Sequence, residues 1–493
     1  MNKRSSGVLM HISSLPGEFG IGSVGKEAYE FVDFLVEAGQ KYWQILPLGH
    51  TSYGDSPYQC FSAFAGNPNF IDLDILKKEE LLNEIDYKNI NFGNNEEVVD
   101  YSLIFKLRNK ILNIAYENFK NKKESDFEIF KNENEFWLED YSSYMAIKEK
   151  FNLKSWREWD DFNIVSRKEE ALKKYKEELK DRIEYYNFVQ YEFFKQWNLL
   201  KSYANEKGIK IIGDLPIYVA DDSADMWSNP NMFKVDKDNK LKVVAGCPPD
   251  AFALTGQLWG NPIYDWEELD RDEYRWWVLR IKESLKIYDV IRIDHFRGFE
   301  SYYEIPFGDK TAEFGVWTKG PGIKLFNAIK KDLGDVNVIA EDLGFMTEEV
   351  IKFRNETGFP GMKVLQFAFG GEDSTDLPHN YTRNTIAYTG THDNDTVLGW
   401  FNNASNAERE KAIKYLKLNK EEGISFGFIR GIWSSVSNIS IATMQDLLEL
   451  DSEARMNIPS ILGGNWQWRM KKGILNKDLS KRLYDLSKLY GRV

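Results

Sequence analysis

The sequence predicts an α/β protein built on a (β/α)8 TIM barrel with inserted subdomains. Three observations favour this fold class: eight short apolar runs are spread along the chain, helical patterns lie between them, and polar residues follow most of the runs. Strands of a parallel sheet are buried on both faces, so each is expected as a nearly continuous apolar run. Helices that alternate with such strands wrap the sheet into a barrel. A chain of 493 residues suits a large barrel with insertions.

The eight apolar runs are the predicted barrel strands. They are GVLMHISSL (7–15), YWQILPLG (42–49), IKIIGDLPIYV (209–219), DVIRIDHF (289–296), VNVIAEDLG (336–344), MKVLQFAF (362–369), NTIAYTGTHDND (384–395) and SIATMQDLL (440–448). Most of them end in small or polar residues on the C-terminal side. In barrels of this class the chemistry takes place at that end of the strands.

Helical patterns separate several of these runs. Residues 26–39 place an apolar stripe on one helix face, and Gly39 is a typical helix stop. Residues 185–208 repeat the pattern before the third strand, and residues 322–334 do so before the fifth. The order strand, helix, strand therefore predicts parallel strands joined by helical crossovers.

Two gaps between strands are too long for simple crossovers. Residues 75–184 are rich in Lys, Glu, Asn, Phe and Tyr with helical periodicity, which predicts an inserted helical subdomain. Residues 220–275 are dense in turn formers and Trp, which predicts a long irregular loop region over the barrel mouth. We therefore divide the chain into barrel strands 1 and 2 (residues 1–74), the helical insertion, and the remainder of the barrel (residues 185–493).

The overall charge narrows the classes of partner. The formal net charge is −13 at pH 7, whereas proteins that bind nucleic acid present basic surfaces to the phosphates. The same charge argues against an anionic membrane face, and the sequence holds no run of 18 apolar residues. The basic start MNKRSS is not followed by the apolar segment of a secretory signal. We therefore expect a cytoplasmic protein that binds neither nucleic acid nor membrane.

Sequence motifs for cofactors and metals are missing. The chain has no phosphate-binding loop and no dinucleotide fingerprint, so we predict no cofactor. DKDN at 236–239 lacks the spacing of a calcium loop and is interpreted as a turn. Cys60 and Cys247 are the two cysteines, so no disulfide framework and no CxxC motif is expected. We predict no metal site, and we predict no particular oligomeric state.

Acidic and basic residues gather at the predicted C-terminal ends of the strands. They are Asp214, Arg292, Asp294, Glu341, Asp342, His392, Asp393 and Asp395. Each one alone has an ordinary structural explanation, because an Asp after a strand is usually a helix cap or turn residue. Several acids that converge on one mouth are harder to explain by stability, since like charges repel and raise each other's pKa. The group as a whole therefore indicates a catalytic site.

Arg292 and Asp294 alternate with apolar residues in the fourth strand, so both lie on the same face. A guanidinium beside a buried carboxylate keeps it ionised and fixes its orientation. An ionised, oriented carboxylate is what a nucleophile for an electrophilic carbon requires. A purely structural ion pair would give the same sequence pattern and stays an alternative.

A second carboxyl with the opposite behaviour is available after the fifth strand. A carboxyl in a less polar site near Asp294 would have a raised pKa and could donate a proton. Two carboxyl groups with these divided roles are the apparatus of retaining glycoside chemistry. Glu341 and Asp342 are both candidates, because both faces of this strand are apolar and alternation cannot choose between them.

Several long motifs in the right order resemble a known family. GDLPIYVA, VIRIDHFRGF, VIAEDLG and YTGTHDNDT resemble the four conserved regions of the α-amylase clan. In detail they are similar to the 4-α-glucanotransferases called amylomaltases or disproportionating enzymes. Further similar stretches are ISSLPGEFGIGSVG, YWQILPLG, GDSPYQCFSAFAGNP, AGCPPDAFALTGQLWGNP, ARMNIPS and GNWQWR. The resemblance spans nearly the whole chain and is weakest in residues 75–184.

The resemblance implies three catalytic residues. Asp294 in RIDHF would be the nucleophile that forms a covalent glucosyl intermediate. Glu341 in AEDLG would be the general acid/base. Asp393 in THDND would stabilise the transition state by holding the 2- and 3-hydroxyls of the distorted sugar.

The resemblance also implies substrate-binding residues, namely Tyr58, Asp214, Gln257, Trp259, Arg292 and His392. Arg292 and His392 would support the sugar and the nucleophile, with help from the aspartate of GDLP. Tyr58 would pack near the cleaved sugar. Gln257 and Trp259 would lie in a loop that closes over the glucan and excludes water, so that transfer outcompetes hydrolysis.

The implied function is transfer of α-1,4-glucan segments from a donor malto-oligosaccharide to the 4-hydroxyl of an acceptor glucan or glucose, within starch, glycogen or maltodextrin metabolism. The chain departs from the family pattern at Cys247, Ser460 and Ile461, which we interpret as loop variation. It ends soon after the eighth strand, so we expect no C-terminal β-sandwich domain of the kind ordinary α-amylases carry.

Three other functions fit parts of the pattern. An α-glucan hydrolase would use the same machinery, and the alternative is open at the level of sequence. A metal-dependent barrel hydrolase could use Asp294, His295, His392 and Asp393, but it would normally need an HxH pair on the first strand, where only His11 is present. A non-catalytic glucan-binding protein would tolerate Asp294→Asn, whereas we expect that change to abolish turnover and leave sugar binding.

Overall fold

The computed structural model describes residues 3–52, 54–122, 124–249, 253–371, 373–461 and 463–493. Eight parallel strands form one sheet in the order β10-β11-β12-β1-β2-β3-β6-β9. They are β1 (Ser5–Leu9), β2 (Tyr42–Gln44), β3 (Lys210–Leu215), β6 (Val290–Ile293), β9 (Val338–Ala340), β10 (Gly361–Val364), β11 (Thr385–Tyr388) and β12 (Ile439–Thr443). Each overlaps one of the eight predicted runs.

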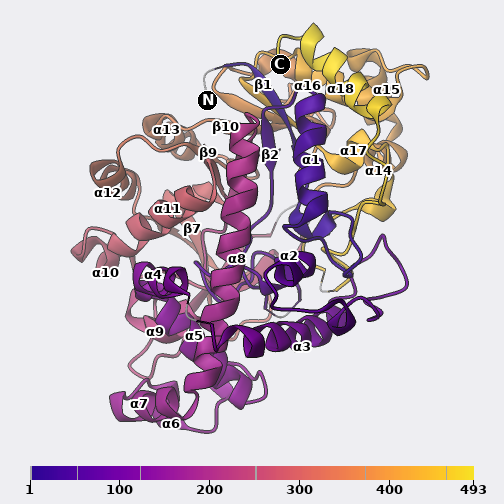
Figure 1. Cartoon of the computed structure of the whole chain (residues 1–493). Helices are drawn as coiled ribbons and strands as arrows, with labels where there is room; N and C mark the ends of the chain where they lie inside the picture. Colours follow the sequence, from indigo (N-terminus) through magenta and orange to yellow (C-terminus); the bar gives the residue numbers. More distant parts are fainter. Residues whose placement is uncertain (1–2, 53, 123, 250–252, 372, 462) are drawn as a thin grey trace.

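The two edge strands of this sheet meet. The amide of Ala340, at the end of β9, donates a hydrogen bond of 2.9 Å to the carbonyl of Pro360, which directly precedes β10. The sheet therefore curls into a nearly closed barrel, and helices surround it (Figure 1). The predicted (β/α)8 barrel is confirmed.

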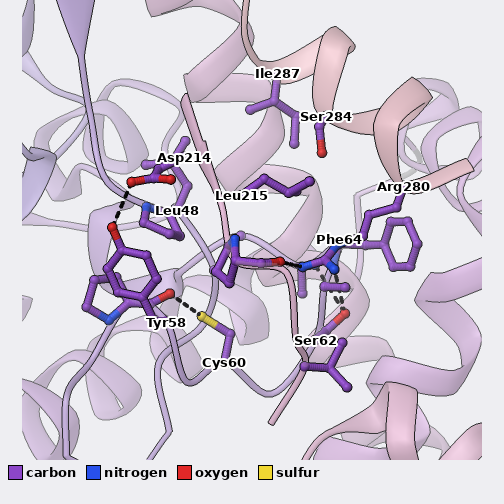
Figure 2. Close-up of a pocket in the computed structure, with 18 of the residues that line it drawn as sticks. Leu48, Tyr58, Cys60, Ser62, Phe64, Asp214, Leu215, Arg280, Ser284 and Ile287 are labelled. Carbon is purple, nitrogen blue, oxygen red and sulfur yellow. Dashed lines mark hydrogen bonds between the residues drawn. The ribbon is translucent and has the colours of Figure 1, made fainter. Parts of the chain in front are cut away.

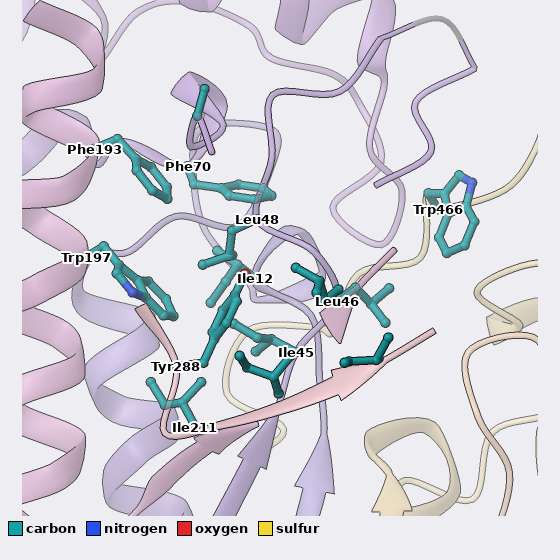
Figure 3. Packing of buried hydrophobic residues seen from close by; sticks show 14 of the residues in the cluster. Ile12, Ile45, Leu46, Leu48, Phe70, Phe193, Trp197, Ile211, Tyr288 and Trp466 are labelled. Carbon is teal, nitrogen blue, oxygen red and sulfur yellow. The ribbon is translucent and has the colours of Figure 1, made fainter. Parts of the chain in front are cut away.

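The barrel interior is filled by apolar side chains from all eight strands. They are Leu9, Tyr42, Ile212, Val290, Ile339, Met362, Val364, Ile386, Tyr388, Ile439 and Ile441. Residues at the alternate positions, such as Ile291 and Ile293 of β6, point outward and pack in the larger core under the helices. Figure 3 shows one part of that core, where Trp197 of α8 (Lys180–Glu206) and Ile211 of β3 pack with Tyr288.

Helices cover the barrel and form most of the long segment before β3. The remaining helices are α1 (Lys26–Glu37), α2 (Leu73–Lys78), α3 (Tyr101–Phe119), α4 (Ser125–Glu133), α5 (Glu135–Lys150), α6 (Phe162–Val165), α7 (Glu169–Glu178), α9 (Ala224–Ser228), α10 (Trp266–Arg271), α11 (Arg275–Ile287), α12 (Ile323–Leu333), α13 (Glu348–Thr357), α14 (Val397–Asn403), α15 (Asn406–Leu416), α16 (Ile424–Ser434), α17 (Met444–Leu447) and α18 (Lys477–Leu489). The three helices predicted around residues 26–39, 185–208 and 322–334 correspond to α1, α8 and α12.

The segment predicted as a helical insertion, residues 75–184, contains α3 to α7 and the start of α8. In Figure 1 these helices lie at the end of the molecule opposite to the chain termini. The helical content follows from the apolar periodicity, since Ile104, Ile111 and Ala115 form a buried stripe on α3. The division of the chain at residues 74 and 184 stays a prediction.

The segment predicted as an irregular loop, residues 220–275, is more ordered than expected, so that interpretation was wrong in part. It contributes β4 (Val243–Cys247) and β5 (Gln257–Pro262) to a second, antiparallel sheet of order β5-β4-β7-β8. The other two strands, β7 (Ser301–Pro306) and β8 (Val316–Lys319), follow β6. Glycines, prolines and a register shift in β4–β5 hide the strand period, and β4 pairs with β7 far along the chain. Residues 250–252 of this segment lie outside the described residues.

The two ends of the chain are tied together at the N-terminal end of the barrel (Figure 1). The buried guanidinium of Arg492 donates to the carbonyl oxygens of Ser5 (2.8 Å), Trp433 (2.7 Å) and Ser435 (3.1 Å). After β12, the described residues form helices and loops and add no further strand to either sheet. Within the described ranges, no helix combines the length and apolar character needed to cross a membrane.

Candidate active site

Four barrel strands carry the predicted site residues at or just beyond their C-terminal ends. Asp214 is the fifth residue of β3, Asp294 directly follows β6, and Glu341 directly follows β9. These three strands are neighbours in the sheet. Asp393 follows β11 across the barrel; its charge acts on Asp294, and the charge of Asp294 acts on Glu341. The fold therefore brings the three predicted catalytic acids to one mouth.

Arg292 connects two of the acids. Its Nη1 lies 2.7 Å from both carboxylate oxygens of Asp214 and 3.1 Å from Oδ1 of Asp294. The Asp214 side chain is fully buried, whereas 29% of the Asp294 side chain is exposed. Asp214 is therefore the main counter-ion of Arg292, and Asp294 is the carboxylate that a substrate can reach.

The environment of Asp294 raises its pKa to about 6. Burial is the largest cause, and the charges of Asp214 and Asp393 act in the same direction, while Arg292 opposes them. Burial outweighs the guanidinium, contrary to the expectation from the sequence, because Arg292 is shared with Asp214. The carboxylate is still ionised for the most part at pH 7.

Glu341 faces the barrel mouth, because it lies two residues after Ile339, whose side chain fills the barrel interior. Its Oε2 accepts the backbone N–H of His295 (2.8 Å), and its Oε1 accepts that of Leu343 (3.0 Å). His295 adopts a left-handed conformation with φ of 52°, which directs its N–H toward the carboxyl. Burial raises the pKa of Glu341 to about 8, with a further contribution from Asp294 that Arg292 opposes.

Asp342 lies on the outer face of the same strand end. Its carboxylate accepts a hydrogen bond from Arg354 on α13 and another from the backbone N–H of Met362 (2.6 Å). These contacts tie β9 and α13 to β10 and give Asp342 a structural position. Of the two carboxyls that alternation left open, Glu341 is the one beside Asp294.

Asp393 is held by two donors. Nδ2 of Asn457 donates to Oδ1 (2.7 Å), and Nε2 of His392 lies 3.4 Å from Oδ2. Burial would raise the pKa of Asp393, but His392, Asn457 and Arg292 together hold it well below its ordinary value. Burial lowers the pKa of His392, but the charge and the hydrogen bond of Asp393 together raise it above its ordinary value. Asp393 is therefore a fixed negative charge, and 44% of its side chain is exposed.

Aromatic rings form one wall of this mouth. The hydroxyl of Tyr58 donates to Oδ2 of Asp214 (2.7 Å), as Figure 2 shows. The Tyr58 ring stacks on His392 with 5.1 Å between centroids, and the Trp466 ring lies 5.9 Å from each of them. A flat apolar wall beside paired carboxylates suits a sugar ring, which has an apolar face and a hydroxyl-bearing edge.

Gln257 and Trp259 lie on β5, not in a loop, because this segment belongs to the second sheet. The indole Nε1 of Trp259 donates to Oε1 of Gln257 (3.0 Å). The Trp259 ring meets the His295 ring edge to face at 4.8 Å, and His295 directly follows Asp294. Both residues are thus brought to the mouth, on a strand that holds them more firmly than a free loop would.

Sequence reasoning assigned no role to Asn457, Trp466 or the backbone of His295. The first two lie in ARMNIPS and GNWQWR, stretches that were noted as similar to the family, so a signal was present without a function attached to it. The His295 N–H left no signal, because a backbone donor is independent of the side chain.

The arrangement combines an accessible carboxylate that ionises near pH 6, a carboxyl that stays protonated to about pH 8, and a third fixed negative charge. Such a site can attack an electrophilic carbon on one side and donate a proton on the other. Within the ranges that the structure describes, no group of three or more His, Cys, Asp or Glu side chains is arranged to hold a metal ion.

Comparisons with known proteins show which family the chain is similar to. The family model for 4-alpha-glucanotransferase matches residues 10–476. A 4-alpha-glucanotransferase of Clostridium butyricum is 58% identical over 98% of this chain and 100% of its own length, and one of Streptococcus pneumoniae is 57% identical over 100% and 98%. The solved amylomaltase of Streptococcus agalactiae in complex with acarbose is 48% identical, with a TM-score of 0.97 over 99% of this chain and 100% of that one.

Proposed function

The chain belongs to the 4-alpha-glucanotransferase family, and on that premise we propose that Asp294, Glu341 and Asp393 carry out its reaction. The activity is transfer of α-1,4-glucan segments from a donor to the 4-hydroxyl of an acceptor with retention of configuration. The α-glucan hydrolase alternative is not favoured by these relatives.

The first step is attack by Asp294 on the anomeric carbon of the donor. The bond between that carbon and the glycosidic oxygen breaks, and Glu341 gives its proton to the departing 4-oxygen. The products are a covalent glycosyl ester on Asp294 and a shortened glucan with a free hydroxyl. Asp393 holds hydroxyls of the same sugar and stabilises the positive charge that develops on the ring.

The second step reverses the first with a different glucan. Glu341, now ionised, removes the proton from the 4-hydroxyl of the acceptor, whose oxygen attacks the anomeric carbon and releases Asp294. The ester carbonyl lies beside Arg292, which stabilises the returning carboxylate charge. Tyr58, His392 and Trp259 form the walls that orient the sugar and limit the access of water.

One observation carries this proposal above all, namely that two differently held carboxyls meet at one mouth: Asp294 is accessible beside Arg292, and both oxygens of Glu341 accept backbone N–H groups. Asp294 ionises near pH 6 and Glu341 near pH 8, so at neutral pH one is a nucleophile and the other an acid. A retaining double displacement requires two neighbouring carboxyls, one ionised and the other protonated.

The test is incubation with maltotriose, followed by product analysis and a count of reducing ends. Transfer produces glucose together with maltopentaose and longer chains, while the total number of reducing ends stays constant. Hydrolysis raises the number of reducing ends with every bond that is cut. A steady rise in reducing ends without longer products would contradict the proposal.

Malto-oligosaccharides are the proposed donors, and glucans or glucose the proposed acceptors, in starch, glycogen or maltodextrin metabolism. The acarbose complex of the Streptococcus agalactiae amylomaltase supports binding of such oligosaccharides by a protein of this fold. A cytoplasmic location is part of the same proposal.

A further inference from the structure

Three aromatic side chains of the second sheet and the loop after β9 are exposed on the molecular surface. Phe314 is 75% exposed, Phe345 is 70% exposed, and Trp317 of β8 is 39% exposed. We call Trp317 and Phe345, which both contact Arg297, the aromatic ledge. A single exposed aromatic side chain is ordinary, whereas neighbouring exposed rings commonly mark a binding site.

A buried arginine holds the two rings of the ledge in place. The guanidinium carbon of Arg297 lies 3.8 Å from the centroid of the Trp317 ring and 5.9 Å from that of Phe345. Its Nη1 also donates to the carbonyl oxygen of Phe345, and its Nη2 donates to Oγ of Ser301 (3.1 Å). Arg297 itself is only 5% exposed. The rings are thus preorganised, and binding would cost little ordering entropy.

A second contact fixes the Trp317 ring from the neighbouring strand. Tyr303 of β7 is paired with Trp317 in the antiparallel register, and the two rings meet at 5.3 Å in an edge-to-face arrangement. The Trp317 ring is therefore held by Arg297 and Tyr303 and still keeps exposed area. A ring held in this way offers a fixed flat surface on which a ligand can stack.

The ledge is carried by the segments that directly follow the two catalytic carboxyls. Arg297 lies in the short 3-10 helix Phe296–Phe299, three residues after Asp294, and Phe345 lies four residues after Glu341. The end of β8 is tied to the same helix, because the N–H of Gly322 donates to the carbonyl of Phe299 (2.8 Å). The loops that carry the two carboxyls therefore lead directly to the ledge.

We propose that the aromatic ledge is a remote subsite for the α-1,4-glucan chain, beyond the residues that contact the cleaved linkage. This inference rests on the proposed function, because it needs a glucan in the mouth. The apolar faces of glucose units would stack on Trp317 and Phe345, as flat apolar rings allow. Lys319 lies two residues after Trp317 on β8 and forms an ion pair with Glu300, the residue before β7. These two charged groups supply hydrogen-bonding partners for sugar hydroxyls at the edge of the ledge.

A remote subsite makes the enzyme sensitive to chain length. Short substrates occupy only the mouth and gain nothing from the ledge, whereas longer chains reach it. Trp317→Ala and Phe345→Ala should therefore raise KM for maltoheptaose by roughly 2- to 12-fold each, the loss expected for one stacked ring. The rate with maltotriose should stay within about twofold of the parent enzyme.

The experiment compares kcat/KM for maltotriose and maltoheptaose in each variant. Phe162→Ala is the matched control, because Phe162 is 68% exposed on α6 at the far end of the helical segment. Trp317→Tyr keeps a flat ring and should restore most of the preference for the long substrate. Phe345→Ala removes a ring with little buried area, so a folding defect in Trp317→Ala would leave the test intact.

Calorimetric titration of maltoheptaose into Asp294→Asn, with and without Trp317→Ala, measures binding apart from turnover. Weaker binding in the double variant supports the subsite. Equal binding overturns it, as does an equal loss for both substrates.

A concentration-dependent dimer of the parent that Phe345→Ala abolishes would assign the ledge to a second copy and would also overturn the proposal. Failure of the parent to transfer maltotriose would instead refute the proposed function.

Discussion

Two buried carboxyls in this chain, Glu341 at the barrel mouth and Glu192 on α8, have the same pKa of about 8. Burial is the main cause in both cases, and a neighbouring acid raises the pKa further, Asp294 for one and Glu79 for the other. A basic residue opposes the shift at both places. By pKa alone the two would be equal candidates for an acid catalyst.

Their surroundings differ in access and in orientation. Glu192 is fully buried, and its partners are Lys195 at 3.4 Å and Glu79 at the C-terminal cap of α2. Glu341 is partly exposed in the mouth, and two backbone N–H groups fix both of its oxygens. A perturbed pKa therefore reports burial and charge, whereas catalysis also needs an oriented carboxyl that a substrate can reach.

The largest effect is expected for Asp294→Asn. The amide cannot form the glycosyl ester, so transfer from maltotriose should fall on the order of 10⁴-fold or more, the scale seen when a covalent nucleophile is removed. Glucose release measures the rate, and titration with maltoheptaose measures binding. Binding should persist, because the walls built by Tyr58, His392 and Trp259 are untouched. Substantial residual transfer would assign the nucleophile to another group.

A paired substitution tests the comparison directly. Glu341→Gln should lower transfer by about 10²–10⁴-fold, the usual contribution of a general acid. Glu192→Gln should leave it within about twofold, because no substrate reaches that carboxyl. A donor with a good leaving group needs less help from a general acid. With such a donor, Glu341→Gln should therefore lose less of its transfer rate. If both variants lose activity equally, access is not what separates the two sites.

Alternation in the sequence predicted which residues of β6 share a face, but it could not do so for β9. Ile291 and Ile293 pack outward and Arg292 points inward, as the polar and apolar pattern indicates. In β9 both faces are apolar, because one fills the barrel interior and the other packs under helices. The inner face is defined only by the neighbouring strands, so the choice of Glu341 over Asp342 needed the structure.

Other features depend on contacts that a linear pattern does not carry. The second sheet pairs β4 with β7 across a long stretch of chain, and its strands contain Gly and Pro. Glu192 lies between aromatic residues of a long helix, and its acidic neighbour Glu79 comes from the C-terminal cap of α2, far away in the sequence. The eight strands were predictable because each buries a local apolar run, whereas these features depend on which distant segment lies opposite.

The pH dependence of kcat/KM should form a bell with limbs near pH 6 and pH 8. Activity falls below pH 6 as Asp294 is protonated, and it falls above pH 8 as Glu341 loses its proton, by about tenfold per pH unit on each side. The two groups interact, so the limbs belong to the pair. Glu192→Gln is the control, since an unchanged alkaline limb assigns that limb to the mouth. If the alkaline limb moves in this variant, it reflects a loss of protein stability and not the ionisation of Glu341.

The smallest effect concerns the contribution of Glu192, on α8, to the stability of the protein. The folded pKa of Glu192 lies above its unfolded value of 4.5, so its stabilising contribution is complete below that pH and is lost as the pH rises through about 8. Glu192→Gln removes this loss, because the amide is neutral and can still donate to Glu79. The free energy of unfolding of the variant should therefore exceed that of the parent by a margin that grows between pH 5 and about pH 8, on the order of a few kcal/mol at the alkaline end, and the melting temperature should rise with it. Thermal unfolding followed by circular dichroism measures the margin, and Glu128→Gln, an exposed acid on α4, should show none. A margin that stays flat with pH would mean that Glu192 is ionised in the folded protein. Glu192 and Glu341 would then share burial but not a raised pKa.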